Sequence, residues 1–201
     1  MRVPGRLERH AALACALGLA ALSGCGARSQ DYGEPSGTYT VDVVRASFPT
    51  EQRLAEKSQM VITVRNPGPK TVPNVAVTVE PVQPNARYKA AAFEETSNQV
   101  GLANPSRPVW TVDAGPRGGV TAYTNTWALG RLRPGETKTF LWRVTAVKPG
   151  VHEVKYTVAA GLNGKAKARL PGGEVPTGSF RITISGAPAQ GALGPGDEPV
   201  R

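Results

Sequence analysis

Residues 60–80 constrain the fold more than any other stretch of this sequence. Apolar and polar side chains alternate through residues 60–64 and again through residues 75–79, on either side of an Asn-Pro-Gly-Pro sequence at 66–69. Such alternation places one face of a strand in a core and the other in water. The two prolines fix φ and lack an amide donor, so the chain must turn between the segments. We therefore predict two strands of an antiparallel sandwich joined by a rigid turn or corner.

Similar strand signals recur along the chain, at residues 39–44, 109–112, 120–129, 140–145, 151–160 and 180–184. The alternation predicts the inward side chains of the last three segments to be Phe140, Trp142, Val144, Val154, Tyr156, Val158, Phe180, Ile182 and Ile184. Residues 88–94 fit either a strand or a short helix, and a doubtful helical pattern surrounds Leu54. Helical periodicity is otherwise confined to the N-terminal segment, so the predicted class is all-β.

The segment at residues 158–170 is predicted to be a β-hairpin. A two-residue loop at Asn163-Gly164 would pair Val158 with Arg169 and put charges beside the apolar face. A three-residue loop with Gly164 at the positive-φ position pairs Val158 with Ala168 instead. Because a slip of one residue moves every side chain to the other face, we predict the second register.

The first residues have the pattern of an export signal. A basic start precedes an apolar run at residues 11–22, which is shorter than the roughly 20 residues that a membrane-spanning helix needs. The run ends in Leu-Ser-Gly-Cys at 22–25, which resembles the lipobox of bacterial lipoproteins and implies that Cys25 becomes the acylated first residue. The alternative is an ordinary leader cleaved nearby, which would leave Cys25 as a free thiol. Cys15 would leave with the leader, so the mature chain has no partner for a disulfide.

Four regions follow from these patterns. We predict a signal peptide at residues 1–24, a lipidated flexible tether at 25–37, one β-sandwich domain at 38–185 and a disordered tail at 186–201. The tether and the tail are composed of small and polar residues without periodicity. The order of residues 81–119 stays open at this stage.

Two motifs made of turn and core residues resemble a known class of domain. Val-Arg-Asn-Pro-Gly at 64–68, followed by Val-Ala-Val at 75–77, is similar to the opening of CARDB and DUF11-type immunoglobulin-like modules. The segment at 127–137, Trp-Ala-Leu-Gly-Arg-Leu-Arg-Pro-Gly-Glu-Thr, resembles a second motif of these modules. The resemblance covers residues 41–158. It implies an immunoglobulin-like β-sandwich used for binding, spacing or adhesion at bacterial surfaces, and it carries no active site.

The side-chain inventory argues against catalysis, metals and cofactors. After removal of the leader, His152 is the one histidine, which excludes a two-histidine metal site or a histidine relay. The sequence Gly-Leu-Asn-Gly-Lys-Ala at 161–166 lacks the first glycine and the Ser/Thr of a phosphate loop. Carboxylates such as Asp42, Asp113 and Glu94 are scattered, and Glu34 is expected in the flexible tether. We predict no enzyme, no metal and no cofactor.

The net charge of +9 becomes +7 without the leader, because 24 basic residues lose three arginines and 15 acidic residues lose one glutamate. A basic stripe of Lys165, Lys167 and Arg169, extended by Lys155 and Arg143, is the candidate contact surface for an anionic polymer. The alternative is a solvated strand face that discourages edge pairing. Nucleic acid is not an expected partner, because no basic surface interleaved with aromatic residues is present. Trp142 is expected in the core, and Trp110 either in the core or at a contact surface.

Two functions remain in competition. In the first, the chain is a non-enzymatic lipoprotein, anchored to the bacterial membrane outside the cytoplasm, whose domain binds or scaffolds an envelope protein or an anionic wall polymer. In the second, it is an accessory subunit of an envelope enzyme or transporter and has no ligand of its own.

Overall fold

The computed structural model describes residues 33–82, 92–95, 108–123 and 125–189, and every regular element in these ranges is a β-strand. No helix in the described ranges is long and apolar enough to cross a membrane. The predicted leader, Cys25 and residues 88–91 lie outside the described residues. The pattern around Leu54 that resembled a helix is a strand, β3 (Glu51–Leu54). The all-β prediction is therefore confirmed.

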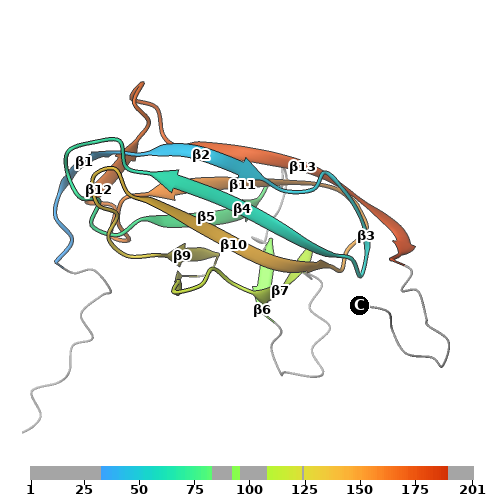
Figure 1. Cartoon of the computed structure of the whole chain (residues 1–201). Helices are drawn as coiled ribbons and strands as arrows, with labels where there is room; N and C mark the ends of the chain where they lie inside the picture. Colours follow the sequence, from blue (N-terminus) through green and yellow to red (C-terminus); the bar gives the residue numbers. More distant parts are fainter. Residues whose placement is uncertain (1–32, 83–91, 96–107, 124, 190–201) are drawn as a thin grey trace, which may run out of the picture.

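Two sheets pack face to face and form an immunoglobulin-like sandwich (Figure 1). The first sheet contains, in spatial order, β2 (Asp42–Ser47), β4 (Lys57–Arg65), β10 (Thr137–Ala146), β7 (Trp110–Ala114) and β6 (Phe93–Glu95). The second contains β3, β13 (Thr177–Pro188), β11 (Gly150–Ala159), β5 (Ala76–Pro81), β9 (Thr126–Ala128) and β8 (Val120–Tyr123). Most neighbours are antiparallel, and the parallel pairs lie at the edges: β3 with β13 and β6 with β7.

A small third sheet pairs β1 (Gly37–Thr40) with β12 (Ala166–Arg169) in parallel. The chain passes from β1 through the buried Val41 into β2, which pairs with β4 of the first sheet. The first predicted strand is thus divided at Val41, because its two halves hydrogen-bond to different sheets.

The predicted turn at residues 66–69 is a corner between the two sheets. β4 belongs to the five-stranded sheet and pairs with β10, whereas β5 belongs to the six-stranded sheet and pairs with β11. The chain therefore passes from one layer of the sandwich to the other at this corner. The alternating apolar residues before and after the corner face the same core from opposite sides. This part of the prediction is confirmed.

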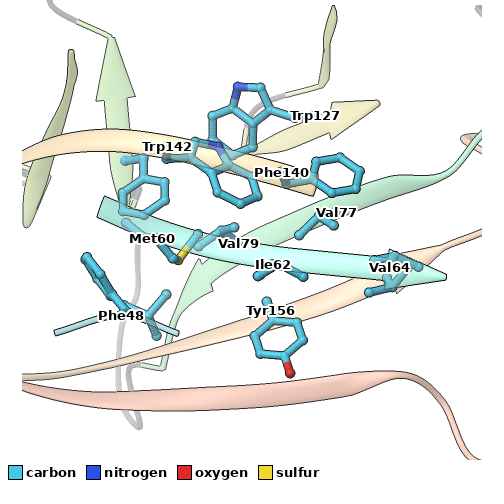
Figure 2. Packing of buried hydrophobic residues seen from close by; sticks show 14 of the residues in the cluster. Phe48, Met60, Ile62, Val64, Val77, Val79, Trp127, Phe140, Trp142 and Tyr156 are labelled. Carbon is cyan, nitrogen blue, oxygen red and sulfur yellow. The ribbon is translucent and has the colours of Figure 1, made fainter. Parts of the chain in front are cut away.

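One hydrophobic core lies between the sheets, and Figure 2 shows its centre. The inward faces predicted for β10 and β11 are buried, and so are Ile182 and Ile184 of β13, while Phe180 packs partly buried against the core. Trp142 stacks on Phe140, with ring centroids 5.8 Å apart, and meets Trp127 edge to face at 5.4 Å. Aromatic pairs of this geometry contribute about 0.5–1.5 kcal/mol beyond the burial of their area.

Trp110 belongs to the core and not to a contact surface. Its side chain is completely buried, and the indole Nε1–H donates a hydrogen bond of 2.7 Å to Oε1 of the buried Gln52. Phe48 and Phe93 pack against the same ring. The surface role that was left open for Trp110 in the sequence is therefore excluded.

The predicted hairpin at residues 158–170 does not form. β11 is already hydrogen-bonded along both edges, to β5 and to β13, and Val158 lies opposite Val77. A strand has two edges, so β12 finds its partner in β1 instead. Gly164 does adopt a positive φ of 74°, as the turn prediction required.

Two further predictions about strand limits differ from the structure. The segment at 120–129 is not one strand, because Asn125, with φ of 63°, turns the chain between β8 and β9, which pair antiparallel. At the C-terminal side, β13 continues to Pro188, past the predicted domain limit at 185. Its last residues remain paired there, because Pro188 lies opposite Leu54 of β3.

Candidate functional site

One end of the sandwich gathers the features that bear on function. The N-terminal segment at residues 33–41, the loops at 66–75 and 129–136, and the segment 160–169 with β12 meet there, on the left in Figure 1. We call these four segments together the tether pole. The opposite end carries β3 and the connections at 48–50, 55–56 and 147–149.

Asn66 ties the corner loop to the neighbouring loop. Its side chain is completely buried; Nδ2 donates to the carbonyl oxygens of Lys70 (2.8 Å) and Leu132 (2.9 Å), while Oδ1 accepts from the amide of Gly68 (3.0 Å). The backbone of Asn66 also bonds to Glu136 and Gly135. This network explains why an asparagine follows β4, because the side-chain amide must both donate hydrogen bonds through Nδ2 and accept one through Oδ1.

The same two loops are joined at further points, which makes the surface of the pole rigid. Val72 and Leu132 exchange two backbone hydrogen bonds, of 2.9 and 3.0 Å. The Oδ1 of Asn74 accepts from the amide of Gly130. The Lys138 ammonium donates to the carbonyl oxygens of Leu129 and Arg131, both at 2.6 Å, so this side chain orders the loop.

The N-terminal segment is fastened to the pole by Glu34. Its carboxylate accepts hydrogen bonds from the amides of Asn163 (2.6 Å) and Ala166 (2.5 Å), and 7% of the residue is exposed. A Cβ on Gly161 would collide with this carboxylate, so the glycine makes room for it. Glu34 was expected in a flexible tether, whereas its side chain is buried against the domain, three residues before β1 begins.

The glycine-containing loop that superficially resembled a phosphate loop thus holds a carboxylate of its own chain. The amides of Asn163 and Ala166 form a concave donor surface of the kind that binds anions. Because Glu34 supplies that anion, the loop serves here to dock the N-terminal segment.

A cavity of about 570 Å³ opens beside this attachment. It lies between the N-terminal segment, the corner loop and the loop at 129–136. Its walls include Glu34, Tyr39, Thr71, Asn74 and Arg131.

The predicted basic stripe lies at the tether pole, although its predicted strand partner was wrong. Lys165 and Lys167 are exposed and Arg169 is half-buried, with the buried Ala166 and Ala168 between them. Alternation alone determines this face, so the change of partner does not affect it. Arg169 donates from Nη1 to the carbonyl of Ala168 at 3.1 Å.

The two residues proposed to extend the stripe lie elsewhere. Lys155 is on the outer face of β11, opposite Glu80, in the six-stranded sheet. Arg143 is on the outer face of β10, in the other sheet, beside a hollow of about 250 Å³ that Arg117 also lines. These residues do not form one surface with β12.

Sequence reasoning missed the basic residues that the loops bring to the pole. Lys70 in the corner loop and Arg131 and Arg133 in the loop at 129–136 are all exposed. Each lies in a Pro/Gly-rich turn, which signals a surface position, but the juxtaposition of the turns depends on the pairing of Val72 with Leu132. The exposed basic residues of the pole are therefore Lys70, Arg131, Arg133, Lys165 and Lys167, with Arg65 at the end of β4 beside them.

The described residues contain no group of three or more His, Cys, Asp or Glu side chains placed to hold a metal ion. His152 has a structural setting: its Nε2 lies 3.1 Å from the carbonyl oxygen of Lys148, and its ring packs edge to face on Trp110 at 6.0 Å. Asp113 accepts from the Thr145 hydroxyl at 2.8 Å. These contacts stabilise the sheets and assemble no nucleophile, base and acid.

No family model and no curated protein matches this sequence. Among solved structures, the chain is similar to a native alpha-2-macroglobulin fragment from Escherichia coli, with 13% identity, a TM-score of 0.44, and coverage of 74% of this chain and 17% of that one. It is also similar to the CARDB domain of a Pyrococcus furiosus protein in complex with di-metal ions, at 15% identity, TM-score 0.39 and coverage of 73% and 85%. A third similar structure is a beta-glucosidase from Listeria innocua in complex with glucose. The identity is 15% and the TM-score 0.39, and the match covers 74% of this chain and 16% of the glucosidase. The chain thus spans less than a fifth of the macroglobulin fragment and of the glucosidase. The assignment to immunoglobulin-like sandwiches rests on the strand order and pairing described above.

Proposed function

We propose that this protein is a lipid-anchored, non-enzymatic module that holds another envelope component, a protein or an anionic wall polymer, outside the cytoplasmic membrane. The observation that carries the proposal is the attachment of the N-terminal segment to one end of a rigid sandwich. Glu34 and the β1–β12 pairing fix that segment to the domain. An anchor at Cys25 would then hold the domain by its tether pole and leave the opposite end and both sheet faces for a partner.

A binding role suits this domain because hydrogen bonds to the backbone already hold the polar side chains of its loops in place. Asn66, Glu34 and Lys138 are all occupied by backbone partners, which makes the surface preorganised and lowers the entropy lost on binding. The exposed face of the six-stranded sheet alternates charges, with Lys155 opposite Glu80 and Glu153 opposite Arg181. Such a face offers complementary contacts to a protein partner.

The anchor is tested first. Cells that produce the full chain are labelled with a palmitate analogue, and the wild type is compared with Cys25→Ala. Incorporation of label in the wild type alone, together with release of the variant from membranes, is the expected result. An unlabelled wild-type protein that washes off membranes in high salt would refute the anchor.

The binding role is tested by affinity capture from solubilised membranes. A protein recovered in a fixed ratio supports scaffolding of an envelope protein, and retention of a phosphate-rich polymer that high salt releases supports the polymer. Recovery of neither, from membranes in which the chain is abundant, would contradict the proposed binding role.

A further inference from the structure

We propose that the tether pole is a membrane-facing surface that docks on anionic phospholipid headgroups of the leaflet in which Cys25 is anchored. This inference rests on the proposed lipid anchor, and it adds an orientation and a ligand class. The proposed ligand is the lipid headgroup. Binding of a soluble anionic polymer in its place is one of the results that the experiment below distinguishes.

The length of chain between the anchor and the pole keeps the pole close to the membrane. Cys25 and Gly33 are separated by about eight residue steps, which span at most about 28 Å when fully extended. The ten-residue strands β10 and β11 are each about 34 Å long. Because Gly33 and Glu34 line the cavity at the pole, the pole remains within one tether length of the headgroups.

The charge of the pole complements such a surface. Lys70, Arg131, Arg133, Lys165 and Lys167 are exposed on loops and β12 that meet at this end. Of the acidic side chains nearby, two accept hydrogen bonds from backbone amides, while Glu174 is exposed in the loop that follows β12. Glu34 binds the amides of Asn163 and Ala166, and Glu136 accepts from the Arg133 amide at 2.6 Å. Asp42, half-buried, lies opposite Arg65 in the pairing of β2 with β4.

The opposite end has no comparable excess among the described residues. Arg53, Lys57 and Lys148 are interspersed there with Glu51 and Glu56. The charge asymmetry between the two ends therefore coincides with the point where the tether leaves the domain.

Covalent attachment favours headgroups over a soluble polymer as the occupant. A tethered surface meets its own membrane at the high effective concentration set by a short linker. Each basic residue near an anionic leaflet contributes on the order of a five-fold increase in the docked population. Neutralising three of them is expected to lower the ratio of docked to undocked molecules roughly 100-fold. Salt should act in the same direction, because the Debye length is about 8 Å at physiological ionic strength.

The experiment uses the mature, acylated protein reconstituted in vesicles. Since Cys25 is blocked by acylation, a single introduced cysteine carries a fluorescent donor, at Thr71→Cys on the pole or at Thr50→Cys at the opposite end; both positions are exposed. Energy transfer to an acceptor on lipid headgroups reports the approach of each end. Vesicles contain either phosphatidylcholine alone or an equal mixture with phosphatidylglycerol.

Two matched triple variants separate specific docking from general attraction. The test variant is Lys70→Gln, Arg131→Gln and Lys167→Gln at the pole. The control is Arg53→Gln, Lys57→Gln and Lys148→Gln at the opposite end, with the same loss of charge from exposed positions. We expect phosphatidylglycerol to increase transfer at residue 71 and not at residue 50, the test variant to abolish that increase, and the control to retain it. High salt should abolish it as well.

Three results would overturn the proposal. Transfer at residue 71 could be independent of lipid charge, the control variant could lose the increase as completely as the test variant, or soluble polyphosphate at equal phosphate concentration could displace the pole from the vesicles. The last result would assign the pole to anionic polymers. Failure of the anchor has a different signature, because an unacylated protein would not stay on vesicles of pure phosphatidylcholine.

Discussion

Asn66 offers the sharpest test of how the tether pole is held together. In Asn66→Ala, the Gly68 amide and the carbonyls of Lys70 and Leu132 lose their partners in a buried site. A net contribution of about 1 kcal/mol for each hydrogen bond gives a loss of about 3 kcal/mol in the free energy of unfolding. For a domain of about 150 residues, this corresponds to a fall in Tm of about 6–12 °C.

Asn66→Asp distinguishes a hydrogen-bond network from simple packing. The aspartate keeps the volume and the acceptor for Gly68, but it turns a negative oxygen toward two carbonyl oxygens where the amide had a donor. We therefore expect this variant to be less stable than Asn66→Ala at pH 7. Its folded-state pKa should be raised, because protonation restores one donor. Stability should then be highest below the unfolded-state pKa of about 3.9 and should fall as pH rises through the folded-state value.

The measurement is urea-induced unfolding of the full chain, followed by tryptophan fluorescence. Thr71→Ala, at an exposed position of the same loop, is the control and should stay within about 0.5 kcal/mol of the wild type. The reasoning would be refuted by an alanine variant within 1 kcal/mol of the wild type. An aspartate variant at least as stable as the alanine variant at pH 7 would also refute it.

Three further predictions concern other parts of the sandwich. Glu34→Ala should lower the free energy of unfolding by about 2–4 kcal/mol, because hydrogen bonds to charged groups are the stronger kind. Hydrogen exchange at the Ala166 amide should also accelerate. Unchanged protection of that amide would contradict the docking of the N-terminal segment. Trp110→Phe should lower the free energy of unfolding by about 1–3 kcal/mol, because it leaves Oε1 of the buried Gln52 without its donor. The double variant with Gln52→Leu should recover part of this stability in thermal unfolding. Burial raises the pKa of Tyr156 above its usual 10.0, so ultraviolet absorbance should show its phenol titrating above pH 10. Because the folded-state pKa is the higher one, this group stabilises the fold below pH 10 and loses that contribution as pH rises through the folded-state pKa.

The placement of the site could be predicted only in part. The face of Lys165, Lys167 and Arg169 followed from alternation and was correct, whereas the partner of β12 was not, because that partner depends on which edges of β11 are already occupied. Lys70 and Arg131 are far apart in the sequence, and their loops are brought together by the pairing of Val72 with Leu132 and by the side chains of Asn66 and Asn74.

The sequence by itself determined the class of fold, the inward faces of the central strands and the corner at residues 66–69. These features are local, because a period of two and the geometry of proline act within a few residues. The tertiary structure alone decided which strands pair, that Trp110 is buried, and that Glu34 occupies the loop at 161–166. Those outcomes depend on groups distant in the chain competing for the same hydrogen-bonding edge or donor, and a local pattern contains no record of that competition.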